Sequence, residues 1–358
     1  MTNINGSRKI SYQIDAMIGN IKYGELECKP PTISMDSELE SSDTGVKYSS
    51  TIETTGYIWQ GGKETSEIFD WAKYQYKIWL IENGEKKSLG IFYPQTIQAS
   101  TEGQTIYEIT GYDKLILAKN DCITARHFIA KGANYINEIS SLLVSCGITH
   151  IISDVSDAVV ASDRDDWEVG TSKLTIINQL LSEISFKSVE VNRDGSAILS
   201  SYKEASAENI QHTYRQGQAS IVKPSTTINS NIFDIPNIWA ATVENPDLNE
   251  IYTYTWINDN PLSRTSTIYT GQNKVKTLSF NNIASQADLE AAVKKQAFDD
   301  MRGYDTIQYQ TAISADHGVN DIVALELPQF NGILTETAWE INFQNMSMSH
   351  KGKKAINY

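Results

Sequence analysis

Alternating residues on either side of one tight turn restrict the fold of this chain more than any other feature. In residues 74–80 every second position is apolar or aromatic, which is the period of a strand with one buried face. The Asn-Gly pair at 83–84 is typical of a hairpin turn. Further strand patterns occupy 88–100 and 105–112. Consecutive strands with tight turns predict an antiparallel barrel or sandwich in residues 1–120.

Residues 121–205 change from strand spacing to helical spacing. The segment 133–146 places apolar residues at intervals of three and four, as an amphipathic helix does. A second helix is expected after Thr171 or Ser172, because either side chain can cap a helix N-terminus. The segment NRDG at 192–195 then joins two short strands. Together these patterns predict a small α+β domain.

Strand patterns return in residues 206–257 and again in 305–350, with a helix between them. Ser285 can cap this helix, and Gly303 closes it. Because the flanking strands look like parts of one sheet, they predict a second, discontinuous β-domain. Residues 258–304 are then an inserted domain that contains the helix.

Composition and charge exclude several classes of partner. The formal net charge is -14, and a field of that sign opposes binding to nucleic acid or to an anionic membrane. No segment approaches the roughly 20 apolar residues of a membrane span. The N-terminus lacks the apolar core of a signal peptide. We therefore expect no nucleic-acid binding, no membrane span and no signal-directed export.

Motifs for catalysis and for metal binding are missing from the sequence. The three cysteines are scattered without a CxxC pair, and the five histidines never fall at metal-ligand spacing. A calcium loop that began at Asp163 would need Gly at its sixth position and Glu at its twelfth, but these positions hold Glu168 and Leu174. We predict no metal, no cofactor and no catalytic residue. His317 and Asp321 could pair, and His317 is expected to be a satisfied surface histidine.

Short motifs follow one another along the chain in a distinctive order. They are SLGIF at 88–92, ITGYD at 109–113, WEVGTSKLTIINQLL at 167–181, DIPNIW at 234–239, NDNPLSRTST at 258–267, HGVNDIVAL at 317–325, WEINF at 339–343 and MSH at 348–350. In this order they resemble the tail-hub proteins of phages and phage-like particles that infect or kill Gram-positive bacteria. The resemblance covers the chain from Phe69 to its C-terminus.

The resemblance implies a β-rich α+β fold with two tube-like β-barrel domains and smaller α+β domains. The expected limits are 1–120 for the first barrel, 121–205 for the α+β domain, 206–257 with 305–350 for the second barrel, and 258–304 for the inserted domain. The resemblance also implies a structural, non-enzymatic role. Three chains would form a hub that adapts a six-fold tail tube to a three-fold spike or fibre.

The partners implied by the resemblance are those of a tail tip. They are two further copies of the chain in a homotrimer, a tail-tube or distal tail protein above, a spike, fibre or needle protein below, and a tape-measure protein in the channel. The particle could be a contractile or flexible-tailed phage or a bacteriocin. The protein would be made in the bacterial cytoplasm, join the tail tip and leave by lysis.

Nine residues form the structural signature that the motifs and patterns single out. They are Trp167, Gly170, Leu174, Pro236, Asn237, Trp239, Asn258, Pro261 and Asp321. Trp167 is expected in the core of the α+β domain. Pro236 and Asn237 are expected to shape a strand edge or bulge, and Asn258 and Pro261 a turn.

Two alternatives to a structural hub remain open from the sequence. A cell-wall hydrolase would use paired carboxylates, either among Asp165, Asp166 and Glu168 or between Glu336 and Glu340. A receptor- or glycan-binding protein would use the seven Trp and 18 Tyr residues for sugar stacking. However, Trp79, Trp239 and Trp339 lie in strand patterns and are expected in the core.

Overall fold

The structure is a computed structural model, and it describes most of the chain. The described residues are 8–37, 45–202, 206–217, 221–230, 235–243, 251–280, 283, 286–302 and 305–354. Ser285 and Gly303, the expected ends of the inserted helix, lie outside these ranges.

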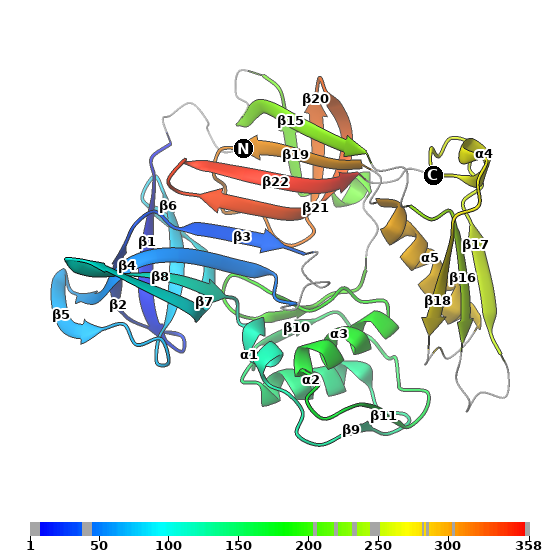
Figure 1. Cartoon of the computed structure of the whole chain (residues 1–358), viewed down its shortest axis with the longest axis horizontal. Coiled ribbons are helices and arrows are strands. Elements are labelled where there is room, and N and C mark those ends of the chain that lie inside the picture. Colours follow the sequence, from blue (N-terminus) through cyan, green and yellow to red (C-terminus); the bar gives the residue numbers. More distant parts are fainter. Residues whose placement is uncertain are drawn as a thin grey trace.

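Six strands of the N-terminal region close into a ring, which we call the first β unit (Figure 1). In ring order they are β4 (Tyr48–Gln60), β2 (Ile21–Cys28), β1 (Ile10–Ile18), β6 (Gln75–Glu82), β7 (Glu85–Glu102) and β8 (Gln104–Tyr112), and β8 pairs back to β4. Strand β5 (Lys63–Ile68) pairs with β4 only. The turn at Asn83 and Gly84 has positive φ at both residues, which confirms the predicted hairpin. The ring encloses a core of aliphatic and aromatic side chains.

The C-terminal strands form a second β unit whose pairings, among the described residues, do not close. Their order is β15 (Val222–Ser230), β19 (Asp305–Thr311), β22 (Ser347–Lys354), β21 (Phe330–Asn342), β20 (Ile322–Leu327) and β14 (His212–Arg215). Strand β3 (Thr32–Asp36) pairs with both β4 and β21. It thereby joins the two units into one 14-stranded sheet. The β-rich α+β fold class is confirmed, whereas the count of two barrels stays a prediction.

An α+β unit with its own core follows the first β unit along the chain and lies below the joined sheet in Figure 1. Its elements are α1 (Leu115–Asn120), β9 (His127–Ile129), α2 (Tyr135–Ser145), β10 (Ile151–Ser153), β11 (Arg164–Trp167), α3 (Lys173–Glu183), β12 (Glu190–Val191) and β13 (Ala197–Leu199), followed by the short helix η2 (Ala207–Asn209). Both predicted helices are present. Ser172 is the N-cap of α3 and accepts a hydrogen bond from Thr175 N. The NRDG segment joins β12 and β13, which pair antiparallel.

A three-stranded sheet covered by one helix forms the inserted unit (Figure 1). Its elements are β16 (Ile238–Val243), β17 (Thr253–Ile257), α4 (Thr267–Thr270), β18 (Val275–Phe280) and α5 (Gln286–Arg302). Residues up to 257 were expected in the second β-domain, but β16 pairs with β17 and β18 in a separate sheet. Their alternating pattern buries one face against α5, and such a pattern does not reveal which partner covers the face. The domain limits otherwise remain a prediction.

Membrane-spanning helices are not found in the part of the chain that the structure describes. No helix there combines the length and the apolar character that crossing a bilayer requires.

Candidate functional site

Three of the signature residues lie together at the start of α3. Trp167 is 4% exposed, and its Nε1 donates to Gln179 Oε1 at 3.0 Å. The Arg164 guanidinium lies 4.6 Å from the centre of the Trp167 ring. Leu174 is buried in the same core. Gly170 has a φ of +94°, a conformation that favours glycine. This group therefore anchors and caps the α+β unit.

Asn237 and Asn258 tie the turn-rich end of the inserted unit together. The Asn237 side chain donates to Gln272 O at 2.9 Å and accepts from Lys274 N at 2.8 Å. Asn258 N donates to Asn237 O at 2.9 Å. The Asn258 side chain donates to Ser263 Oγ at 3.0 Å. These buried amides fix the loop around Pro261.

Trp239 lies deeper in the inserted unit than these amides. It is fully buried, and its Nε1 donates to Asp300 Oδ2 at 2.7 Å. Trp339 is also buried, while Trp79 is only half-buried. Pro236 directly precedes Asn237 at the start of β16, and Asp321 lies in the second β unit. The signature residues are thus spread over three units and do not meet in one site.

The carboxylates considered for a hydrolase do not converge either. Asp165 pairs with Arg126 and Asp166 pairs with Arg164. Glu336 and Glu340 are both on β21, but Glu336 is buried and Glu340 is exposed. A pair that flanks a glycosidic bond must face a common groove. This geometry therefore offers no support for glycoside cleavage by these residues.

Eight strands of the large sheet form a continuous surface that we call the wall. In order they are β7, β8, β4, β3, β21, β22, β19 and β15, and all seven pairings between neighbours are antiparallel. One face of the wall is buried in the cores through residues such as Ile33, Ile52 and Ile341. The opposite face carries the alternate residues, as the period of a strand dictates.

Uncharged polar side chains dominate the exposed face of the wall. One cross-strand row consists of Ser347, Asn342, Thr32, Thr51, Thr110 and Thr96. A second row consists of Gln310, Ser349, Glu340, Ser34 and Ser49. A groove of about 480 Å³ crosses this face from β3 to β15. Charged residues are also present, with Glu340 in the second row, Asp36 and Lys351 in the next row, and Glu53 opposite Glu108, so the wall offers a hydrogen-bonding surface with charges of both signs.

A cluster of titratable side chains lies beneath the wall, in the second β unit. His317 Nδ1 and His350 Nδ1 contact the two oxygens of Glu336 at 2.6 and 2.5 Å. His317 Nε2 meets the Tyr214 hydroxyl at 2.5 Å, and His350 Nε2 meets the Thr311 hydroxyl at 2.8 Å. Both imidazoles and the carboxylate are at most 3% exposed. We call these residues the histidine cluster.

A β-bulge brings Glu336 into this cluster. The register between β21 and β22 shifts between Glu336 and Ala338, so that Thr337 is an extra residue. Bulges re-aim neighbouring side chains, and here the shift turns Glu336 toward the core. Burial alone would raise the pKa of the Glu336 carboxyl, but the hydrogen bonds from His317 and His350 lower its pKa to about 2. Burial lowers the pKa of His350.

His317 differs from the expectation of a surface histidine. It is fully buried, and its partners are Glu336 and Tyr214. Asp321 instead faces His212, with 3.1 Å between Oδ2 and Nε2. Sequence patterns singled out Glu336 only as a hydrolase candidate and did not predict its contact with His350, because a bulge is not visible in a period-two pattern. Their separation of 14 residues along a hairpin was the only available signal.

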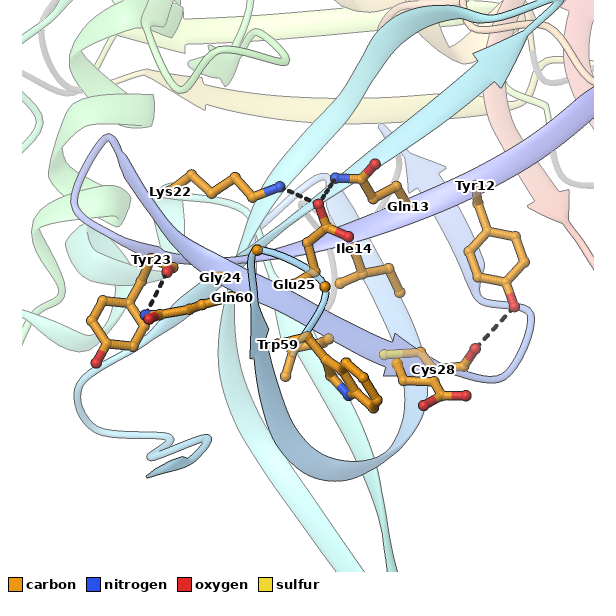
Figure 2. A pocket seen from close by; sticks show the side chains of 14 residues that line it. Tyr12, Gln13, Ile14, Lys22, Tyr23, Gly24, Glu25, Cys28, Trp59 and Gln60 are labelled. Carbon is orange, nitrogen blue, oxygen red and sulfur yellow. Dashed lines mark hydrogen bonds and ion pairs between the residues drawn. The ribbon is translucent and has the colours of Figure 1, made fainter. Parts of the chain in front are cut away.

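A second groove lies on the outside of the first β unit (Figure 2). It measures about 870 Å³ and is lined by β1, β2 and residues 59–62. Lys22 Nζ lies 2.9 Å from Asp15 and 2.6 Å from Glu25, and the Tyr12 hydroxyl donates to Cys28 O. These polar groups already satisfy one another. We therefore assign no chemistry to this groove.

The fold is shared with solved phage tail proteins over nearly the whole chain. A tail protein from Neisseria meningitidis MC58 has a TM-score of 0.67 and 10% identity, with 96% of each chain covered. The 43 kDa tail protein of prophage MuSo2 from Shewanella oneidensis has a TM-score of 0.67 and 9% identity, covering 96% of this chain and 99% of that one. Prophage tail protein gp18 from Listeria monocytogenes EGD-e has a TM-score of 0.59 and 9% identity, covering 97% and 96%.

Sequence comparisons add nothing to this structural likeness. Neither a protein-family model nor a curated protein matches the chain. The resemblance expected from the sequence is confirmed at the level of the fold.

Proposed function

We propose that this chain is a non-enzymatic structural subunit of a phage or phage-like tail, and that three copies form a hub at the distal end of the tail tube. The shared fold of solved tail proteins supports a place in a tail. The observation that carries the hub is the wall, because its two end strands have free edges that match each other.

Both end strands of the wall, over residues 226–230 of β15 and 93–102 of β7, have an edge that no other described strand covers. Among the described strands, β15 pairs only with β19, and residues 93–102 of β7 pair only with β8. A free strand edge is a template for pairing with another chain. Because eight strands alternate in direction, β15 of one copy would run antiparallel to β7 of the next. The wall of one copy could therefore continue into the wall of the next as one antiparallel sheet.

Three copies close such a wall into a ring. Each copy contributes eight strands, so the closed barrel would have 24, and barrels of this size enclose a lumen. The contact is heterologous, with a different edge on each side, as cyclic closure requires. Two β units per chain would present six similar units to the tube above. The other face would keep three-fold symmetry for a spike, fibre or needle protein below.

The exposed face of the wall would then line the channel. Its Ser, Thr, Asn and Gln side chains offer many weak hydrogen bonds, and its charged side chains are of both signs, which suits a polypeptide or DNA that must slide. A tape-measure protein is the cargo we assign to it. The net charge of -14 also disfavours retention of DNA. Tight, salt-sensitive DNA binding by the purified protein would contradict this assignment.

The junction between copies can be tested at Ile228 on β15. Its side chain is 41% exposed, and its cross-strand partner Ile307 is fully buried. Closure against β7 would bury Ile228, so we expect Ile228→Lys to fold but to fail to enter particles. Leu262→Lys is the matched control, because Leu262 is 89% exposed and lies in the inserted unit, outside the wall.

Reconstruction of the assembled particle is the decisive measurement. It should place three copies at the end of the tube, with β15 of each copy beside β7 of the next. Six copies in the ring, or efficient assembly of Ile228→Lys, would overturn the model. A monomeric purified protein is compatible with it, because neighbouring rings can supply the template for closure.

A further inference from the structure

The histidine cluster brings imidazoles and a carboxylate together in the interior of the second β unit, where apolar side chains could fill the same space. Two of the five histidines of the chain, His317 and His350, lie within it, and a third, His212, stacks on His317 with 4.0 Å between ring centroids. They come from the loop that precedes β20, from β22 and from β14. Two of these imidazoles direct their Nδ1 atoms to the two oxygens of one buried carboxylate. Two imidazoles with one carboxylate are a ligand set that transition metals bind.

The remote nitrogens of both imidazoles are oriented as metal-bound histidines are. Each Nε2 meets a hydroxyl group, Tyr214 for His317 and Thr311 for His350. The Thr311 hydroxyl also lies 2.9 Å from Ala312 O, which can accept its only hydrogen. Thr311 then accepts from His350 Nε2–H, so Nδ1 of a neutral His350 would turn its lone pair toward Glu336. Either a proton, as in the hydrogen bond between His350 and Glu336, or a metal ion between the two atoms makes this contact favourable.

We propose that Glu336, His317 and His350 form a structural site for a divalent transition metal, with zinc as the preferred ion. The carboxylate would supply both oxygens and each imidazole its Nδ1, giving a four-coordinate site. The Tyr214 and Thr311 hydroxyls would fix the orientation of the two rings through their contacts with Nε2. Hydrogen bonds to the remote ring nitrogen orient metal-bound histidines in the same way. The ion would take the place of the protons that otherwise join the three side chains.

Zinc binding would require the Glu336 carboxylate and the two imidazoles to move apart by less than about one ångström. The two N···O separations are 2.6 and 2.5 Å. Zinc bonds of about 2.0–2.2 Å at near-tetrahedral angles place a ligand nitrogen and a ligand oxygen roughly 3.4 Å apart. The carboxylate must therefore retreat from each imidazole by roughly 0.8 Å. Glu336 adjoins the bulge at Thr337, where the ladder is locally interrupted and such movement is easiest.

Burial makes the site structural rather than catalytic. The three ligands are at most 3% exposed, so no coordination position opens to solvent, as a catalytic zinc would need. The ion would connect β21, β22 and the loop before β20, whose Arg193 contact at His317 O reaches the α+β unit. Because the ligands meet only in the folded chain, the metal would be taken up during folding.

Metal analysis of the full, untagged chain tests the proposal. Protein produced in zinc-supplemented medium and dialysed against metal-free buffer should contain about one zinc per chain by elemental analysis, as expected for one closed site. Glu336→Gln should lose this zinc, and His150→Asn, which changes an exposed histidine, should keep it. Refolding with Co²⁺ should give the visible absorption of a tetrahedral cobalt site.

Two outcomes would overturn the site. One is wild-type protein with less than about a tenth of a zinc per chain and no cobalt absorption after refolding. The other is zinc retained equally by wild type and Glu336→Gln, which would place the ion elsewhere. If Glu336→Gln does not fold, the wild-type zinc content and cobalt spectrum decide the question alone.

Discussion

The two β units are joined in one sheet, yet they are built in opposite ways. The first closes its strands into a ring around an apolar and aromatic core. The second leaves its described pairings open and buries His317, Glu336 and His350 beside its apolar residues. A closed ring removes its own edges, whereas an open one invites a partner. The first unit therefore covers most of its strand edges itself and still leaves residues 93–102 of β7 beside one described strand only, whereas the second unit does not close its pairings at all.

The same contrast appears in one buried carboxylate from each region. Asp113, at the end of the first unit, accepts hydrogen bonds from the backbone N–H groups of Tyr48 and Leu115. Burial nevertheless raises the pKa of Asp113 to about 6. The pKa of Glu336 is lowered to about 2, because two imidazoles outweigh the effect of burial. At Asp113 the backbone donors and the charge of Lys47 do not offset desolvation, while the paired imidazoles do at Glu336.

The largest expected effect tests whether the first unit depends on its apolar core. Phe92 is fully buried and stacks on Tyr76 with 5.7 Å between ring centroids. Phe92→Ala should lower the free energy of unfolding by roughly 3–5 kcal/mol, measured by denaturant titration. Glu340→Ala, on the exposed face of the wall, should change it by less than about 0.5 kcal/mol. Similar small losses for both would mean that the ring is not a packed core.

The next effect is a pH dependence that separates the two carboxylates. The pKa of Asp113 is about 6 when folded, against an ordinary value of 3.8. Folding therefore takes up a proton between these values, and the Asp113 contribution to stability grows as pH falls from about 6 to 4. It is absent above pH 6. A shift of about two pKa units corresponds to roughly 3 kcal/mol.

Asp113→Asn should remove this contribution. The difference in unfolding free energy between wild type and Asp113→Asn should favour the wild type increasingly as pH falls from about 6 to 4. A difference that does not vary with pH would show that the carboxyl stays ionised in the folded protein. In that case Asp113 and Glu336 would both be ionised in the folded protein, and their pKa values would not differ in the way described above.

A smaller effect is expected from the polar interior of the second unit. Tyr214→Phe removes the hydroxyl that meets His317 Nε2 at 2.5 Å and leaves a buried imidazole nitrogen without this partner. Such a loss costs roughly 1–3 kcal/mol, visible as a lower thermal midpoint. Tyr269→Phe is the control, because Tyr269 is 62% exposed. Equal midpoints for both variants would argue that the cluster is dispensable for folding.

The smallest expected loss of stability lies in the α+β unit, outside both β units, and provides a reference for the other variants. Ser172 caps α3 by accepting from Thr175 N. Ser172→Ala should cost about 1 kcal/mol, and Ser172→Asp should restore most of it because Asp is also a good cap. If Asp does not rescue stability, the loss at Ser172 comes from something other than the cap.

Local features of the fold could be predicted from the sequence. The turn at 83–84, the cap at Ser172 and the hairpin at 192–195 each depend on neighbours along the chain. Trp239 and Trp339 were expected in the core and are buried. These predictions succeeded because period and turn chemistry are set within a few residues.

Partner choice and strand register could not be predicted. Nothing in the pattern of β16 says that it pairs with β18 rather than with the large sheet. Strict alternation along β21 would have placed Glu336 on the same face as Glu340, and only the extra residue at Thr337 reverses this. The histidine cluster depends on that reversal and on contacts more than 100 residues apart, such as Tyr214 with His317. Both are properties of the folded chain.

Strand β3 gives the sheet a mechanical property. Its five residues pair on one side with β21, at five positions, and on the other with β4, at four. A pull along the strands that separates the two β units would load these pairs in shear, all at once. A pull across the strands would open them one after another, like a zipper. The sheet is therefore stiffest along its strands, which in a closed ring would run largely in the direction of the channel and of any axial load on it.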